Sequence, residues 1–388
     1  MIACYEKYKC ELYNVARAAA LTRVGHTAHH LQINGNPDWI LLVGGANLSR
    51  CCKNALLVNI KKGQFHSTDQ PDTLPDPGLA RYEQSSCIYD NEIIIFGGAT
   101  SEQPLNDMLR LKLKSDALIG LKPSSQLFAP TANLITVPIC EISPRTQHTS
   151  DCITNAGEIL IFAGGNKGSE PVDDPLVHVF EVKTGKWRTV ETHVEENDVP
   201  QCRMGHLMLL RPRRNDQSFL NQEVLYIHGG MSGNEFFDDF YRLQLKRTKA
   251  EDGEARLTGK WQNLRSTVSA KGSFWPVARA GHGGAIIYSN TNILRFFIFG
   301  GLNSSGPLND LHYFDEGSKQ WTTVTVSGNV APSPRLDFAF TTLRLKVANP
   351  NFNPHPDEFI STFSMSTLDD DDTEKNPSGD EGFLQFPS

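Results

Sequence analysis

The chain has 388 residues, 31 of them glycine, enough for two or three average domains or one large repeat array. Its charged first residues lack the apolar run of a signal peptide, and no stretch approaches the roughly 20 apolar residues of a membrane helix. Eight cysteines without a CxxC pair favour reduced thiols over a zinc or redox site. These features exclude a transmembrane protein and a disulfide scaffold.

The formal net charge of −7 is concentrated in the last residues. Residues 349–388 hold nine acidic residues and one lysine, which contribute −8 and leave residues 1–348 at +1. A nearly neutral body does not indicate a nucleic-acid-binding protein. Because the segment 349–388 is acidic and poor in apolar residues, we expect it to be a disordered tail.

The N-terminal part of the chain supplies the first of a series of internal repeats. Four or five apolar residues run into a double glycine at five places: Gly44–Gly45, Gly97–Gly98, Gly164–Gly165, Gly229–Gly230 and Gly300–Gly301. Nine residues after each second glycine stands a short polar residue: Asn54, Asp107, Asp174, Asp239 and Asp310. Five matches at one offset predict a repeat architecture.

Two further markers precede each doublet. An arginine leads a short strand-like segment six times: Arg23, Arg81, Arg145, Arg203, Arg279 and Arg335. Three residues later stand His26, Gln84, His148, His206, His282 and Phe338. Before each arginine, at a distance of 14 to 18 residues, stands an aromatic residue: Tyr8, Phe65, Phe128, Trp187, Trp261 and Trp321.

The markers predict units of four short strands. Strand a follows the arginine, strand b ends in the glycines, strand c follows the Asp or Asn, and strand d carries the aromatic residue. A continuous apolar strand b is typical of a sheet buried on both faces, and paired glycines permit a sharp turn. Since one such sheet cannot bury both its faces alone, the units must stack in a ring.

These markers resemble the kelch-repeat family, which implies an all-β propeller over residues 1–348, closed by a strand at about 5–15. TRVGHTA at 22–28, ARYEQSS at 80–86 and LVHVFEVKTGKW at 176–187 resemble kelch effectors of the late-endosomal Rab GTPase. That resemblance implies a scaffold that binds a GTP-loaded Rab in transport from endosomes to the trans-Golgi. It also implies a cytoplasmic protein, peripheral on endosomal membranes.

Six blades are expected, with the sixth incomplete. Arg335 can lead a strand a, and the segment around Tyr8 can supply strand d, but no apolar run ending in two glycines follows Arg335. The only candidate filler is the segment 357–368, which has weak alternation. The sequence therefore predicts either an open ring or a gap beside the last strand a.

The charged and imidazole side chains leave alternatives open. The six repeat arginines either line one mouth of the ring and bind an acidic partner, or pair with Asp and backbone carbonyls between strands. The repeated histidines fit packing or hydrogen bonding near the channel better than metal binding, because each stands on a different blade. Long connections carry a basic group that is a second candidate interaction surface: Arg211, Arg213, Arg214, Lys246, Arg247 and Lys249.

No catalytic, metal or cofactor motif stands in a suitable context, so we expect a non-enzymatic protein without a cofactor. The main alternative to a Rab effector is the substrate-recognition subunit of a ubiquitin ligase. A generic cytoskeletal or scaffold kelch protein is the other.

Overall fold

A computed structural model gives the fold. It describes residues 8–9, 23–33, 36–47, 50–52, 55–59, 64–67, 79–112, 133–135, 142–193, 199–212, 223–249, 255–265, 274–289, 291–327, 332–344 and 360–365. Every element named among these residues is a β-strand. Across the described ranges no helix is long and apolar enough to cross a membrane.

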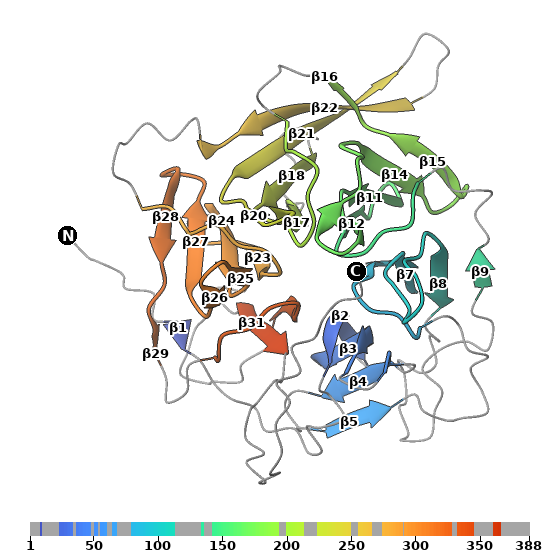
Figure 1. Ribbon diagram of the computed structural model, residues 1–388, viewed down its shortest axis with the longest axis horizontal. Helices are drawn as coiled ribbons and strands as arrows, with labels where there is room; N and C mark the ends of the chain where they lie inside the picture. The colour runs from blue at the N-terminus through green and yellow to red at the C-terminus, as the bar shows by residue number, and fades with distance from the viewer. Residues whose placement is uncertain are drawn as a thin grey trace.

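Sheets follow one another in chain order around a central axis (Figure 1). Blade 1 contains β2 (Val24–Ile33), β3 (Asn36–Ala46), β4 (Leu56–Asn59) and β5 (Gln64–Ser67). Blade 2 contains β6 (Ser85–Tyr89), β7 (Glu92–Phe96), β8 (Met108–Lys112) and β9 (Asn133–Ile135). Blade 3 contains β10 (Thr149–Ile153), β11 (Glu158–Phe162), β14 (Val177–Glu181) and β15 (Lys186–Thr189). Each is an antiparallel meander in the predicted order a, b, c, d.

Blades 4 and 5 repeat this order. Blade 4 contains β17 (Leu207–Leu210), β18 (Glu223–His228), β21 (Phe240–Lys249) and β22 (Ala255–Asn263), with β16 (Glu191–His193) added at its outer edge. Blade 5 contains β23 (Gly283–Tyr288), β24 (Leu294–Phe299), β27 (Leu311–Asp315) and β28 (Gln320–Thr323). Small hairpins extend the b–c connections of blades 3 to 5: β12 (Gly165–Lys167) with β13 (Glu170–Pro171), β19 (Met231–Ser232) with β20 (Glu235–Phe236), and β25 (Leu302–Asn303) with β26 (Gly306–Pro307).

The core lies between neighbouring blades. Every residue of β11 and of β18 is buried, as a strand covered on both faces requires. The tryptophan of strand d packs against the preceding blade: Trp187 lies 5.5 Å from Phe96, and Trp261 lies 5.9 Å from Phe162, between ring centroids. These rings supply large buried surfaces that hold adjacent sheets together.

In the part of the chain that the structure describes, blade 6 is incomplete, as the sequence predicts. Among the described residues its sheet has two strands, β30 (Ala339–Arg344) and β31 (Ile360–Met365). The boundary predicted at residue 348 is therefore wrong in one respect, because β31 comes from the segment assigned to the tail. The rest of residues 349–388 lies outside the described residues, as does Phe128; strand d of blade 2 is Asn133–Ile135.

The N-terminal strand pairs with the segment that follows blade 5. In blade 4, β16 follows strand d of blade 3 and pairs in parallel with β22, which is strand d of blade 4. In the same way β29 (Val326–Ser327) follows strand d of blade 5 and pairs in parallel with β1 (Tyr8–Lys9). A propeller closed by its N-terminal strand would show this correspondence, and the assignment of β1 to the strand-d position of blade 6 stays a prediction.

A closed ring of backbone hydrogen bonds joins all six blades around the axis. The residue two positions after each repeat arginine donates its N–H to the carbonyl of its counterpart on the preceding blade, over N···O distances of 2.7 to 3.1 Å. We call these residues the collar: Gly25, Glu83, Gln147, Gly205, Gly281 and Asp337. The collar corrects the expectation of an open ring, and β31 fills the place beside the last strand a.

Candidate functional site

The repeat arginines of blades 2 to 5 pair with the repeat aspartates. Arg279 donates to both carboxylate oxygens of Asp310 at 2.6 and 2.8 Å, and Arg81 and Arg203 bind Asp107 and Asp239 in the same bidentate way. Arg145 binds Asp174 at 2.7 Å. Each guanidinium also donates to the carbonyl at the end of strand b, for example to Gly300 at 3.0 Å.

This pairing decides between the two roles that the sequence left open for these arginines. The first five repeat arginines are 2% exposed or less, so their side chains cannot form part of an interaction surface. Arg335 is partly exposed and donates to the Ser333 carbonyl and hydroxyl. Asn54, the blade 1 counterpart of the aspartates, lies outside the described residues.

Two of the aspartates, Asp174 and Asp310, are held ionised by these contacts. Burial opposes ionisation of Asp310, but hydrogen bonds from Arg279 and His312 lower the pKa of its carboxyl below the usual range. His178 and Arg145 lower the pKa of Asp174 in the same way against the effect of burial. The pairs are therefore structural clamps within each blade.

The glycine doublets join each blade to the next. The second glycine donates its N–H to the carbonyl of the next repeat arginine, as Gly230 does to Arg279 at 2.8 Å. Both residues of the doublet have positive φ, for example 61° at Gly229 and 100° at Gly230. At Gly229 an added Cβ would lie 2.6 Å from the Arg279 carbonyl oxygen, which explains why glycine is needed there.

Blade 3 departs from the predicted register by one residue. There Ala163 and Gly164 have positive φ, and the N–H of Gly164 donates to the Arg203 carbonyl at 2.8 Å. Gly165 lies instead in β12. The prediction of Gly164–Gly165 as the turn doublet is thus wrong, and the b–c connection of blade 3 is one residue longer than the apparent spacing indicates.

The repeated histidines take part in packing and hydrogen bonds between blades. His148 Nε2 lies 2.8 Å from the Ser85 hydroxyl, His206 Nε2 lies 2.6 Å from the Thr149 hydroxyl, and His282 Nε2 lies 3.0 Å from His228 Nδ1. Burial, with the charge of Arg145, lowers the pKa of His148 to about 3, so the ring is neutral at neutral pH. In the described part of the chain no group of three or more potential ligands is placed to hold a metal ion.

The structure brings only some residues of the predicted basic group to one surface. Lys246, Arg247 and Lys249 lie on β21 in a hairpin, where the sequence suggested a loop insertion, and the pairing with β22 extends from Tyr241↔Asn263 to Lys249↔Ala255. Arg247 binds both oxygens of the buried Glu158 in blade 3, at 2.9 and 2.5 Å. Arg213 and Arg214 lie outside the described residues.

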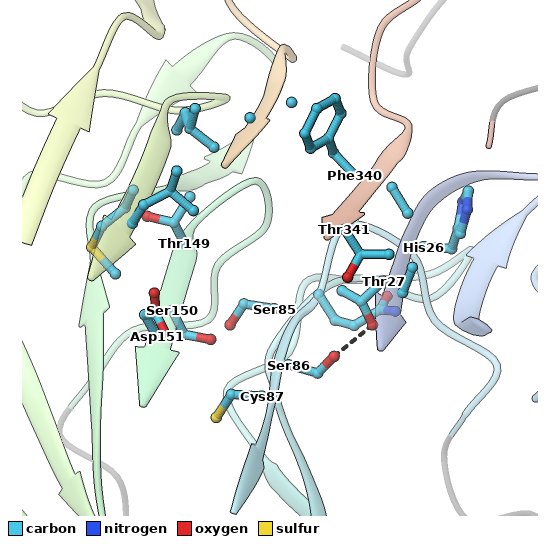
Figure 2. Close-up of a pocket in the computed structure, with 18 of the residues that line it drawn as sticks. His26, Thr27, Ser85, Ser86, Cys87, Thr149, Ser150, Asp151, Phe340 and Thr341 are labelled. Atoms are coloured by element: carbon cyan, nitrogen blue, oxygen red, sulfur yellow. Dashed lines mark hydrogen bonds between the residues drawn. The ribbon is translucent and has the colours of Figure 1, made fainter. Parts of the chain in front are cut away.

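A cavity of about 480 Å³ occupies the centre of the ring. It begins at the collar and extends along the six inner strands (Figure 2). The sequence did not single out its carboxylates, Glu83, Asp151 and Asp337. The recurrence of glycine two residues after Arg23, Arg203 and Arg279 was the available signal that this position needs positive φ.

The six-sheet ring, the arginine–aspartate clamps and the glycine turns define a kelch-type β-propeller. The chain belongs to this family: the KLHDC2/KLHL20/DRC7 kelch-repeats domain matches residues 25–250 and 148–347.

Particular relatives are the Rab9 effector proteins with kelch motifs. The human protein is 31% identical over 222 residues, which cover 56% of this chain and 51% of the relative. The zebrafish (Danio rerio) protein is 32% identical over 209 residues, or 53% of this chain and 51% of the relative. Tip elongation aberrant protein 3 of Schizosaccharomyces pombe is 25% identical over 200 residues, or 47% and 16%. The chain thus spans about half the length of the Rab9 effector relatives.

Proposed function

We propose that the chain is a non-enzymatic interaction scaffold that acts as an effector of a GTP-bound Rab GTPase in transport from endosomes to the trans-Golgi. The observation that carries this proposal is the identity of 31% and 32% with the human and zebrafish Rab9 effectors. In this proposal the protein is cytoplasmic and associates peripherally with endosomal membranes.

The fold supports a binding role through connections rather than through the repeat residues. The repeat arginines, aspartates and glycines are used within and between blades. Partner recognition therefore falls to exposed side chains on loops and outer strands, where kelch scaffolds of the same fold can differ. Lys246 on the projecting β21–β22 hairpin is exposed, and Arg211 follows β17 of the same blade.

The proposal is tested by recovering the full chain on immobilised Rab proteins, Rab9 included, loaded with GDP or with a non-hydrolysable GTP analogue. Recovery with the GTP analogue at least tenfold above recovery with GDP is expected. Equal recovery with both nucleotides, or none with any Rab, refutes the effector function.

A charge-reversed variant locates the surface. Arg211→Glu with Lys246→Glu should weaken Rab binding and reduce its dependence on salt. Lys186→Glu is the matched control, since Lys186 is an exposed lysine on the outer strand of blade 3. Equal binding by the double variant and the control would place the Rab surface elsewhere on the molecule.

A further inference from the structure

The central cavity carries negative charge without a compensating cation. Its charged lining groups are Glu83, Asp151 and Asp337, and no lysine or arginine is among the described residues that line it. The imidazoles of His29 and His148 do not offset this charge, because burial lowers the pKa of His29 to about 4 and of His148 to about 3. When its carboxylates are ionised, the cavity therefore attracts cations, and a bound cation in turn favours their ionised form.

Two of the carboxylates flank a single collar residue. Gly25 donates its N–H to the Asp337 carbonyl at 2.9 Å and accepts the N–H of Glu83 at 2.7 Å. Burial, together with the charge of Glu83, raises the pKa of Asp337 to about 7. Burial likewise raises the pKa of Glu83, against a hydrogen bond from the Gln147 amide at 3.0 Å.

Asp337, a collar residue, differs from the repeat aspartates in its partners. Within the described residues no hydrogen bond or ion pair reaches its carboxylate, whereas Asp107, Asp174, Asp239 and Asp310 each bind an arginine. A carboxylate held in a cavity wall without a partner is costly. A positively charged donor bound in the cavity would offset that cost.

The walls above the collar differ in chemistry. One wall carries hydroxyl and carboxyl groups, including Ser86 and Asp151, and the other is apolar, with Leu207, Leu209 and Phe340. Figure 2 shows Thr149, Ser150 and Asp151 facing Phe340 and Thr341 across the space. Such a cavity fits a slender molecule with an aliphatic stem and several hydrogen-bond donors at its end.

We propose that the central cavity binds an alkylammonium group, a primary amine on an unbranched aliphatic stem, with the ammonium at Asp337 and Glu83. An ammonium has three donors and no acceptor, which matches the carboxylates and hydroxyls near the collar. The stem packs against Leu207, Leu209 and Phe340, as the stems of lysine side chains pack on apolar surfaces. The group comes from a free polyamine or from a lysine side chain of a partner protein.

The experiment titrates the full chain by calorimetry with cadaverine, with the matching diol and with a capped lysine peptide. Cadaverine or the peptide is expected to bind with a Kd of about 1 mM or below, and the diol is not. Tighter binding of cadaverine assigns the free polyamine as the source, and tighter binding of the peptide assigns a protein lysine. Binding of neither amine, or equal binding of the diol, overturns the proposal.

Variants place the site in the collar. Asp337→Asn should weaken amine binding about tenfold or more, since it removes a charged acceptor. Asp90→Asn is its matched control: Asp90 is exposed and has a φ of 51°, close to the 49° of Asp337. Glu83→Gln is the second variant, and it should fold because Gln147 occupies the equivalent collar position with a φ of 48°. Unchanged affinity in folded Asp337→Asn or Glu83→Gln protein refutes the assignment.

Discussion

The inter-blade contact of a glycine doublet can be measured apart from the strain of its backbone. Gly229 and Gly168 have nearly the same φ, 61° and 62°, but an added Cβ at Gly229 would lie 2.6 Å from the Arg279 carbonyl oxygen, whereas nothing lies within 4 Å at Gly168. Gly168→Ala therefore reports the cost of a left-handed alanine alone, about 1 kcal/mol. Gly229→Ala adds the displacement of a carbonyl that accepts the N–H of Gly230 at 2.8 Å.

We expect Gly229→Ala to reduce the free energy of unfolding by about 3 kcal/mol or more, because a weakened buried hydrogen bond costs about 1–3 kcal/mol beyond the strain. Urea unfolding of both variants and the wild type, with equal m-values, measures the difference. Equal losses in the two alanine variants would refute the claim that this glycine is needed for contact with the next blade.

Three further outcomes follow from the clamps and the buried ionisable groups. Arg279→Lys should lower the free energy of unfolding, measured with urea, by about 2–4 kcal/mol, since lysine cannot replace the bidentate pair with Asp310; a loss of less than about 1 kcal/mol would contradict the clamp. Burial lowers the pKa of His148 to about 3. Its contribution to the free energy of unfolding is therefore fully present above the unfolded pKa of about 6.5 and is lost as pH falls. His148→Gln should accordingly flatten the acid side of a plot of the melting temperature, Tm, against pH. Because the pKa of Asp337 is raised to about 7, its ionisation opposes folding at higher pH, so Asp337→Asn should raise Tm at about pH 8 and lose that gain toward about pH 4; a constant gain across this range would show that the charge is not its cause.

The blades could be predicted because each marker residue has one structural role that only its residue type can fill. An arginine, a glycine turn and an aspartate recur at one spacing because Arg203, Gly229 and Asp239 must meet at hydrogen-bond distance. A tryptophan recurs on strand d because each blade presents one face to its neighbour. The choice between surface and clamp roles for the arginines needed the structure, since both roles favour the same residue at the same place.

Positions where the structure does not require one particular residue type could not be predicted. The register of blade 3 was missed because Ala163 adopts positive φ, at 53°, where the other doublets have glycine. β31 could be named only as a candidate, within 357–368, because its segment, ISTFSM, alternates weakly and carries no turn marker. The β21–β22 extension was read as a loop because charged residues in an exposed hairpin follow no burial pattern.

The collar joins blade 6 to both of its neighbours although the described residues give its sheet two strands. Its bonds join backbone groups, so they require positive φ but no particular side chain, and Gly25, Glu83 and Asp337 satisfy them equally. Closure therefore leaves the collar side chains free to vary. Glycine at half of these positions makes room at the axis, and carboxylates at two of them place charge beside that room at a cost to stability. A costly charge that closure does not require is the pattern expected of a residue kept for binding.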